Sequence, residues 1–156
     1  MKKLISIALL LVIWIIGSAA TARPRPEILG ISLDMSRDAA RTRLQSIGSL
    51  QKEDRKRQEV WAVKDSRISH LLIGYDADYH VRYVTAIARA DGPRIRYQEV
   101  VDLKTAQGSN TPGNHKFTWE VEEHRGKEAF IIIARGRDAQ YLDSYSVKKA
   151  DQEEID

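Results

Sequence analysis

The sequence contains no cysteine. Disulfide bonds, thiolate metal sites and a cysteine nucleophile are therefore excluded, and so is the lipid-modified cysteine of a bacterial lipoprotein. The domain must fold on its hydrophobic core without a covalent staple. Long apolar runs are nearly as scarce, because the only one lies at residues 4–17.

That apolar run has the features of an export signal. Two lysines precede its fourteen residues, which as a helix would span about 21 Å, short of the roughly 30 Å hydrocarbon core of a membrane. Ala20 and Ala22 supply the small residues that signal peptidase requires. We therefore predict a signal peptide at residues 1–22, cleaved after Ala22, and an exported protein that is periplasmic or secreted. An uncleaved N-terminal anchor, as in an inner-membrane subunit, is the alternative.

The sequence also lacks a clear excess of either positive or negative residues. Cleavage would remove two lysines and no acid, leaving 23 basic residues (25 − 2) against 22 acidic ones, a net charge of +1. Nucleic-acid-binding domains need a concentrated positive balance, so we predict no nucleic-acid partner, and no membrane partner after cleavage. The basic run Lys52–Arg57 is interrupted by acids and predicts a solvated loop or the entry to a strand.

The first half of the expected domain, residues 23–90, has the pattern of one helix followed by three strands. Ser36 can cap a helix that carries Ala40, Leu44 and Ile47 on one face and ends at Gly48. Alternating apolar residues then predict strands at 60–63, 69–75 and 81–87. The short link at 76–78 predicts an antiparallel hairpin.

The second half, residues 91–148, repeats this order. Pro93 lies near the first turn of an expected helix that carries Tyr97, Val100 and Val101 and ends at Gly108. A loop is expected next, at 109–114. Strands are expected at 117–121, 129–134 and 141–147. The polar residues from Lys148 onward predict a flexible acidic tail, assigned to 149–156.

Three landmarks recur at nearly one offset. The tripeptides at Trp61 (WAV) and Trp119 (WEV) lie 58 residues apart, whereas Asp78 and Asp138 lie 60 apart, as do the Gly-Ser pairs at 48 and 108. Such an offset is typical of an internal repeat. We expect an α+β fold with helices on one face of an antiparallel sheet, built as a tandem duplication of α-β-β-β. Chance is the alternative, because short matches are common.

Recognisable catalytic motifs are missing. The histidines at 70, 80, 115 and 124 are never three or four residues apart, so no pair shares a helical face for a metal ion. Ser66, Ser69 and His70 lack the glycines of a nucleophile elbow. Asp76 and Asp78 begin like a calcium loop, but a hairpin turn explains them, since no further carboxylate follows. We predict no catalytic residue, no metal and no cofactor.

Large aromatic residues on the expected strands are the candidates for contact with a partner. Residues in phase with the helix-covered face are buried, whereas those on the opposite face are available to a partner. The sequence does not fix the phase between strands, so burial in the core is the alternative for each. The candidate partner-binding residues are Trp61, Tyr75, Tyr83, Trp119 and Tyr141.

The helix segment MSRDAARTRL, the IGS that closes it, the strand motif WAV and the hairpin LLIGYDADYHVRYV resemble exported domains of the β-lactamase inhibitor protein type. The small outer-membrane assembly lipoproteins SmpA and OmlA share this layout. The resemblance spans 28–89 well and 91–147 weakly, and it departs at Asp34, where the family has glycine. It implies helices on one face of an antiparallel sheet, two such units in tandem in the inhibitor, and a non-enzymatic module that holds a protein partner. No single binding residue can be transferred.

Two functions follow as hypotheses. The preferred one is an exported, non-enzymatic protein-binding module whose partner is an envelope or secreted protein. The alternative is a small periplasmic ligand-binding protein or enzyme that uses Asp, His and Tyr from separate strands around a pocket on a curved sheet. A deep pocket that encloses His70 or His80 with a buried carboxylate would favour the alternative.

Overall fold

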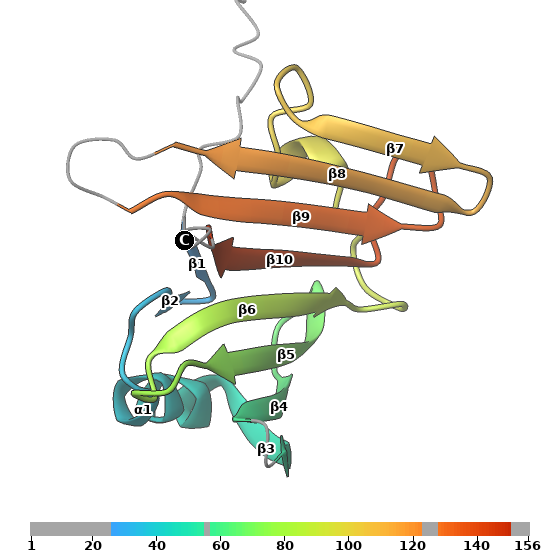
Figure 1. Ribbon diagram of the computed structural model, residues 1–156. Coiled ribbons are helices and arrows are strands. Elements are labelled where there is room, and N and C mark those ends of the chain that lie inside the picture. The colour runs from blue at the N-terminus through green and yellow to red at the C-terminus, as the bar shows by residue number, and fades with distance from the viewer. Residues whose placement is uncertain (1–25, 55–56, 123–127, 151–156) are drawn as a thin grey trace, which may run out of the picture.

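The computed structural model describes residues 26–54, 57–122 and 128–150. Its main element is one antiparallel sheet of eight strands in the order β3-β4-β5-β6-β10-β9-β8-β7 (Figure 1). The predicted signal peptide and residues 151–156 of the predicted tail lie outside the described residues. Within the described ranges, no helix is long and apolar enough to cross a membrane.

The elements follow the chain in a simple order. A small hairpin comes first, with β1 (Glu27–Ile28) and β2 (Ile31–Ser32). The helix α1 (Arg37–Ile47) leads into the first four sheet strands, β3 (Gly48–Asp54), β4 (Gln58–Val63), β5 (Ile68–Tyr75) and β6 (Val81–Ala88). A 3₁₀ turn, η1 (Tyr97–Glu99), precedes the last four, β7 (Gln107–Thr111), β8 (Asn114–Val121), β9 (Phe130–Gly136) and β10 (Ser144–Lys149).

The predicted helix and strands of the first half are confirmed. The Ser36 hydroxyl accepts a hydrogen bond from the Ala39 backbone N–H at 3.4 Å, which caps α1, and Gly48 ends it. Ala40 and Leu44 are buried on the face turned to the sheet. The predicted hairpin between β5 and β6 pairs antiparallel.

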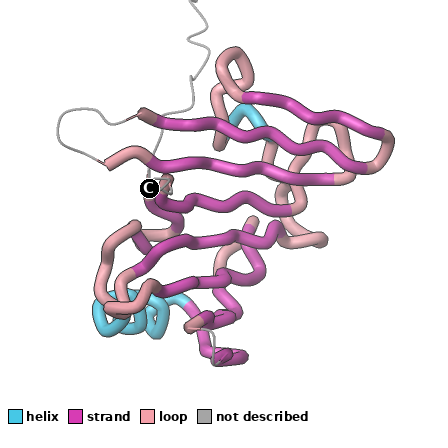
Figure 2. Tube along the Cα trace, in the orientation of Figure 1, coloured by secondary structure: helices cyan, strands magenta, loops and turns pink. Residues whose placement is uncertain are grey.

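The prediction of a second α-helix is wrong. Residues 97–99 form only one 3₁₀ turn (Figure 2), and the following segment breaks from the helical path at Asp102. The Asp102 carboxylate accepts from the Lys104 backbone N–H at 3.0 Å. Asp competes for local backbone groups in this way, and adjacent valines favour helix weakly. Ile95, Tyr97 and Val101 are nevertheless buried, so the segment covers the sheet without being a helix.

Four strands were missed, namely the short hairpin strands β1 and β2 and one sheet strand in each half, so each half contributes four strands to the large sheet instead of the predicted three. Gly48, expected to end the helix, and the first part of the run Lys52–Arg57, expected as a solvated loop or the entry to a strand, belong to β3, and most of the expected loop at 109–114 belongs to the β7–β8 hairpin. β3 and β7 are edge strands, which carry polar residues because they border solvent. Lys149, assigned to the predicted tail, instead belongs to β10, where Lys148 and Lys149 pair with Ile131 and Phe130.

The halves are two four-stranded meanders joined along their last strands, β6 and β10. Residues directly opposite in antiparallel strands lie on the same face. One face therefore carries the cross-strand row Trp61, Leu71, Ala86, Tyr145, Ala134 and Phe117, and beside it the row Glu59, Ile73, Val84, Val147, Ile132 and Trp119. We call this the covered face. It holds most of the buried core, with α1 packed over the first meander and Tyr97 against Phe117, at 4.7 Å between ring centroids, in the second.

Asp34 occupies the position where the resembling family has glycine, and its backbone explains why. Its φ is 64°, in the left-handed region that favours glycine and tolerates aspartate. Its N–H donates to the Val81 carbonyl at 2.9 Å, and its carboxylate forms an ion pair with Lys149. The aspartate therefore adopts a glycine-like conformation and adds a link to the last strand.

Candidate functional site

The five predicted partner-binding aromatics do not form one surface. Trp61 and Tyr75 are buried on the covered face, only 3% and 6% exposed, and Trp119 is half-buried on that same face. Tyr83 lies on the opposite face across Gly74. Tyr141 lies in the turn before β10, with the Arg94 guanidinium 4.3 Å from its ring centroid.

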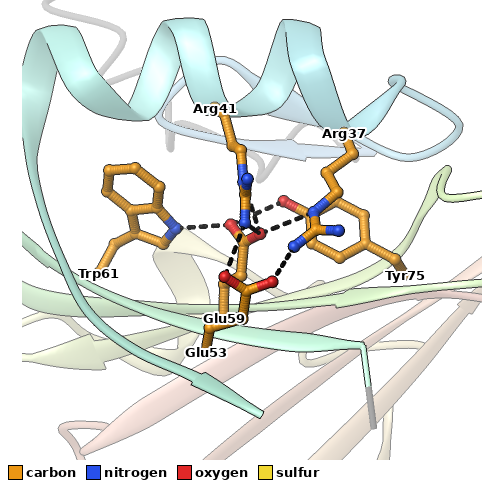
Figure 3. A network of polar contacts seen from close by, with 6 residues as sticks. All are labelled: Arg37, Arg41, Glu53, Glu59, Trp61 and Tyr75. Carbon is orange, nitrogen blue, oxygen red and sulfur yellow. Dashed lines mark hydrogen bonds and ion pairs between the residues drawn. The ribbon is translucent and has the colours of Figure 1, made fainter. Parts of the chain in front are cut away.

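A buried carboxylate, Glu59, is the centre of the densest polar network. Its Oε1 accepts from Arg37 Nε at 2.9 Å and from Arg41 Nε at 2.8 Å. Its Oε2 accepts from Trp61 Nε1 at 2.9 Å and from the Tyr75 hydroxyl at 3.1 Å. Figure 3 shows the two arginines reaching down from α1, with Trp61 and Tyr75 on either side of the carboxylate. At 1% exposure, Glu59 is satisfied by four side chains and is closed to solvent.

A second carboxylate closes the network at the surface. Glu53, on the edge strand β3, accepts from Arg41 Nη2 at 3.0 Å and also bonds Arg37, while half its side chain remains exposed. The network therefore ties α1 to β3, β4 and β5. The Arg37 guanidinium also lies over the ring of the exposed Tyr79, 5.3 Å from its centroid.

The environment sets the charge states in this network. Burial alone would raise the pKa of Glu59, but hydrogen bonds from Arg41, Trp61 and Arg37 outweigh it and lower the pKa below its usual value. The pKa of Tyr75 is raised well above its usual value, first by burial and then by the adjacent Glu59 charge. Glu59 therefore stays ionised and Tyr75 stays protonated as its donor.

Sequence reasoning missed this network, although the signals were present. Glu59 alternates in phase with Trp61 and Val63, which places all three on one face of a strand. Arg37 and Arg41 fall on the helical stripe that also contains Ala40 and Leu44. The available clue was that both elements carry charged residues on the same face as their apolar residues.

Beside the network lies a shallow hollow of about 250 Å³, lined by Arg41, Gln45, Gly48, Ser49, Leu50 and Trp61. Neither Glu59 nor any histidine lines it. No group of three or more His, Asp or Glu side chains in the described ranges could hold a metal ion. The contacts of the network hold α1 on the sheet, and its central carboxylate, Glu59, is closed to solvent.

The face of the sheet opposite α1 is the larger exposed feature. Its residues come from the alternate positions of the same strands, and apart from Gly74, which lies under Tyr83, all those described are half-buried or exposed. We call it the open face. Its large apolar members are Val60, Leu72, Tyr83, Ile87, Ile131 and Ile133.

The open face is also basic. By register, its charged residues are Lys52, Asp54, Lys116, Glu120, Arg135 and Lys148, four cations against two carboxylates. Lys116 and Arg135 lie directly opposite each other on β8 and β9. Like charges in this arrangement repel and cost stability, and no ion pair of either residue occurs within the described residues.

No protein-family model matches the chain, and neither a curated protein nor a solved structure shows significant similarity to it. The resemblance to the β-lactamase inhibitor protein type therefore stays a prediction.

Proposed function

We propose that this chain is an exported, non-enzymatic module that binds a protein through the open face of its sheet. The observation that carries the proposal is the composition of this face, an apolar centre spanning both meanders with a surplus of cations. Protein interfaces combine such an apolar centre with charged surroundings that select the partner. The partner surface is accordingly acidic and belongs to an envelope or secreted protein.

A non-enzymatic role is supported by the way the polar groups are used. The most buried titratable group, Glu59, has all its hydrogen-bonding capacity taken by Arg37, Arg41, Trp61 and Tyr75. A general acid or base needs access to substrate, and an exposure of 1% denies it. Among the described residues, no observation favours the alternative of a ligand-binding protein or enzyme.

We also infer that the two meanders arose by duplication of one unit. Trp61 and Trp119 lie on the second strand of their meanders and on the same face, and Asp78 and Asp138 lie in the turns before the last strands. Sequences of related chains test this inference. Pairwise conservation of these landmarks is expected, and their independent variation would contradict duplication.

Site-specific photo-crosslinking in the producing cells tests the binding role. A photoreactive residue at Ile133, on the open face, should capture a protein, whereas the same residue at Ala39, on the exposed side of α1, should not. Combined Lys116→Glu and Arg135→Glu substitutions should abolish capture at Ile133, because they repel an acidic partner. Equal capture at both positions, or capture indifferent to the charge reversal, would contradict the proposal.

The export assignment has its own test. N-terminal sequencing of the protein recovered from the envelope or medium should begin at Arg23. A sequence that retains residues 4–17 would instead support the anchored alternative.

A further inference from the structure

The two edges of the sheet differ in their protection. β3 carries Lys52 and Glu53, contains a bulge between Leu50 and Lys52, and lies against α1. Charges, bulges and covering elements are the devices that prevent another strand from pairing with an edge. β7, with the sequence QGSNT, has no charge, is exposed at all five residues, and pairs with β8 in an unbroken register. Only the β7 edge is therefore open to strand addition.

The backbone of β7 fixes which groups face outward. Its hairpin with β8 turns at Pro112 and Gly113, so Thr111 and Asn114 form the hydrogen-bonded pair that closes the turn. Hydrogen-bonded and non-hydrogen-bonded pairs alternate along an antiparallel ladder. Ser109 therefore bonds to β8, whereas the N–H and C=O groups of Gly108 and Asn110 point away from the sheet.

We propose that two copies of this chain associate by antiparallel pairing of their β7 strands about a twofold axis at Ser109. This axis brings Gly108 of each copy opposite Asn110 of the other. The N–H of each of these residues then donates to the C=O of the residue opposite. The side chains suit the pairing, because Ser109 meets a second serine, and Asn110 meets a glycine. The strand has no charge that would repel its copy.

The charges and size of this contact predict its strength. Five residues make an interface well below the roughly 1,000 Å² of a stable complex, so the dimer is weak and depends on concentration. Lys116 lies beside Ser109 on β8. The two copies of Lys116 would be three strand spacings apart, about 14 Å, so their repulsion is screened at physiological salt and dimerisation strengthens as salt rises.

Sedimentation equilibrium on the protein recovered from its producing cells tests the pairing, over about two decades of concentration up to about 1 mM. The wild type should show a monomer–dimer equilibrium. Ser109→Lys and Ser109→Glu should each weaken it by about tenfold or more, because like charges would meet at the axis. An equimolar mixture of the two variants should restore association. The matched controls are Ser49→Lys and Ser49→Glu at the β3 edge, which should leave the equilibrium unchanged.

Each other result overturns the proposal. A wild-type protein that stays monomeric up to about 1 mM excludes self-pairing and leaves β7 for a strand of a different protein. A dimer that ignores both Ser109 substitutions uses another surface. Two weakened variants that fail to associate when mixed exclude the twofold axis at Ser109. Circular dichroism of every variant verifies that the fold is intact.

Discussion

Replacing Glu59 by glutamine tests the central interaction of the first meander. The substitution keeps the size of the side chain but removes the negative charge that faces Arg37 and Arg41. Removing one partner of a fully buried ion pair costs about 3–5 kcal/mol. The cost here is smaller, about 2–3 kcal/mol, because the arginine side chains remain 23% and 32% exposed and Glu53 still pairs with them.

The loss is measurable by urea denaturation followed by tryptophan fluorescence, because Trp61 donates to Glu59 and reports on this site. A decrease of 2–3 kcal/mol corresponds to a fall in Tm of about 10 °C for a domain of this size. Glu53→Gln is the matched control. Glu53 is half exposed, so its loss should cost less than about 1 kcal/mol. If Glu59→Gln destabilised the protein no more than Glu53→Gln, the conclusion that the buried Glu59 holds α1 on the sheet would be wrong.

The same variant has a defined pH signature. Because folding lowers the pKa of Glu59, its ionisation stabilises the fold at pH values above the unfolded pKa of about 4.3. That contribution is lost as the pH falls through the lowered folded pKa. The difference between wild type and Glu59→Gln should therefore shrink in acid, below about pH 4.

Three further predictions address other parts of the fold. Asp34→Ala should destabilise the protein by about 1–2 kcal/mol in thermal denaturation, because alanine is strained at positive φ. Asp34→Gly also loses the Lys149 ion pair but should cost less, because glycine is not strained there. Equal costs of the two substitutions would contradict the backbone explanation. Burial raises the pKa of Tyr145 to about 12, so its neutral form stabilises the fold below pH 10, and this contribution is lost as the pH rises toward 12. An alkaline absorbance titration in which Tyr145→Phe removes a step near pH 12, while the later step of Tyr75 remains, would verify this. Gly74→Ala would place a Cβ 2.0 Å from the Tyr83 ring and should lower the free energy of unfolding by about 1–3 kcal/mol. The same substitution in a Tyr83→Ala background should lower it little. If the two effects are additive in this double-mutant cycle, the contact with Tyr83 is not the cause of the destabilisation.

The sequence by itself determined the elements whose signal is local. The serine cap, the stripe of Ala40 and Leu44 and the terminal Gly48 defined α1, and alternation in phase with a buried face defined β4, β5 and β6. These patterns depend on neighbours within a few residues, so they can be recognised in the sequence without knowledge of the fold. The turn at Asp76 was equally local, because its carboxylate accepts from the N–H groups of Asp78 and His80.

Only the tertiary structure decided the rest. β3 and β7 are strands because β4 and β8 lie beside them, since their own polar residues do not show the alternation of a buried face. The pairing of β6 with β10 joins segments about sixty residues apart and turns two meanders into one sheet with an open face. Glu59 acquires its four donors from α1, β4 and β5 only when these elements are assembled. A buried charge is tolerable only after its partners are in place, so its role is a property of the fold and not of any local stretch of sequence.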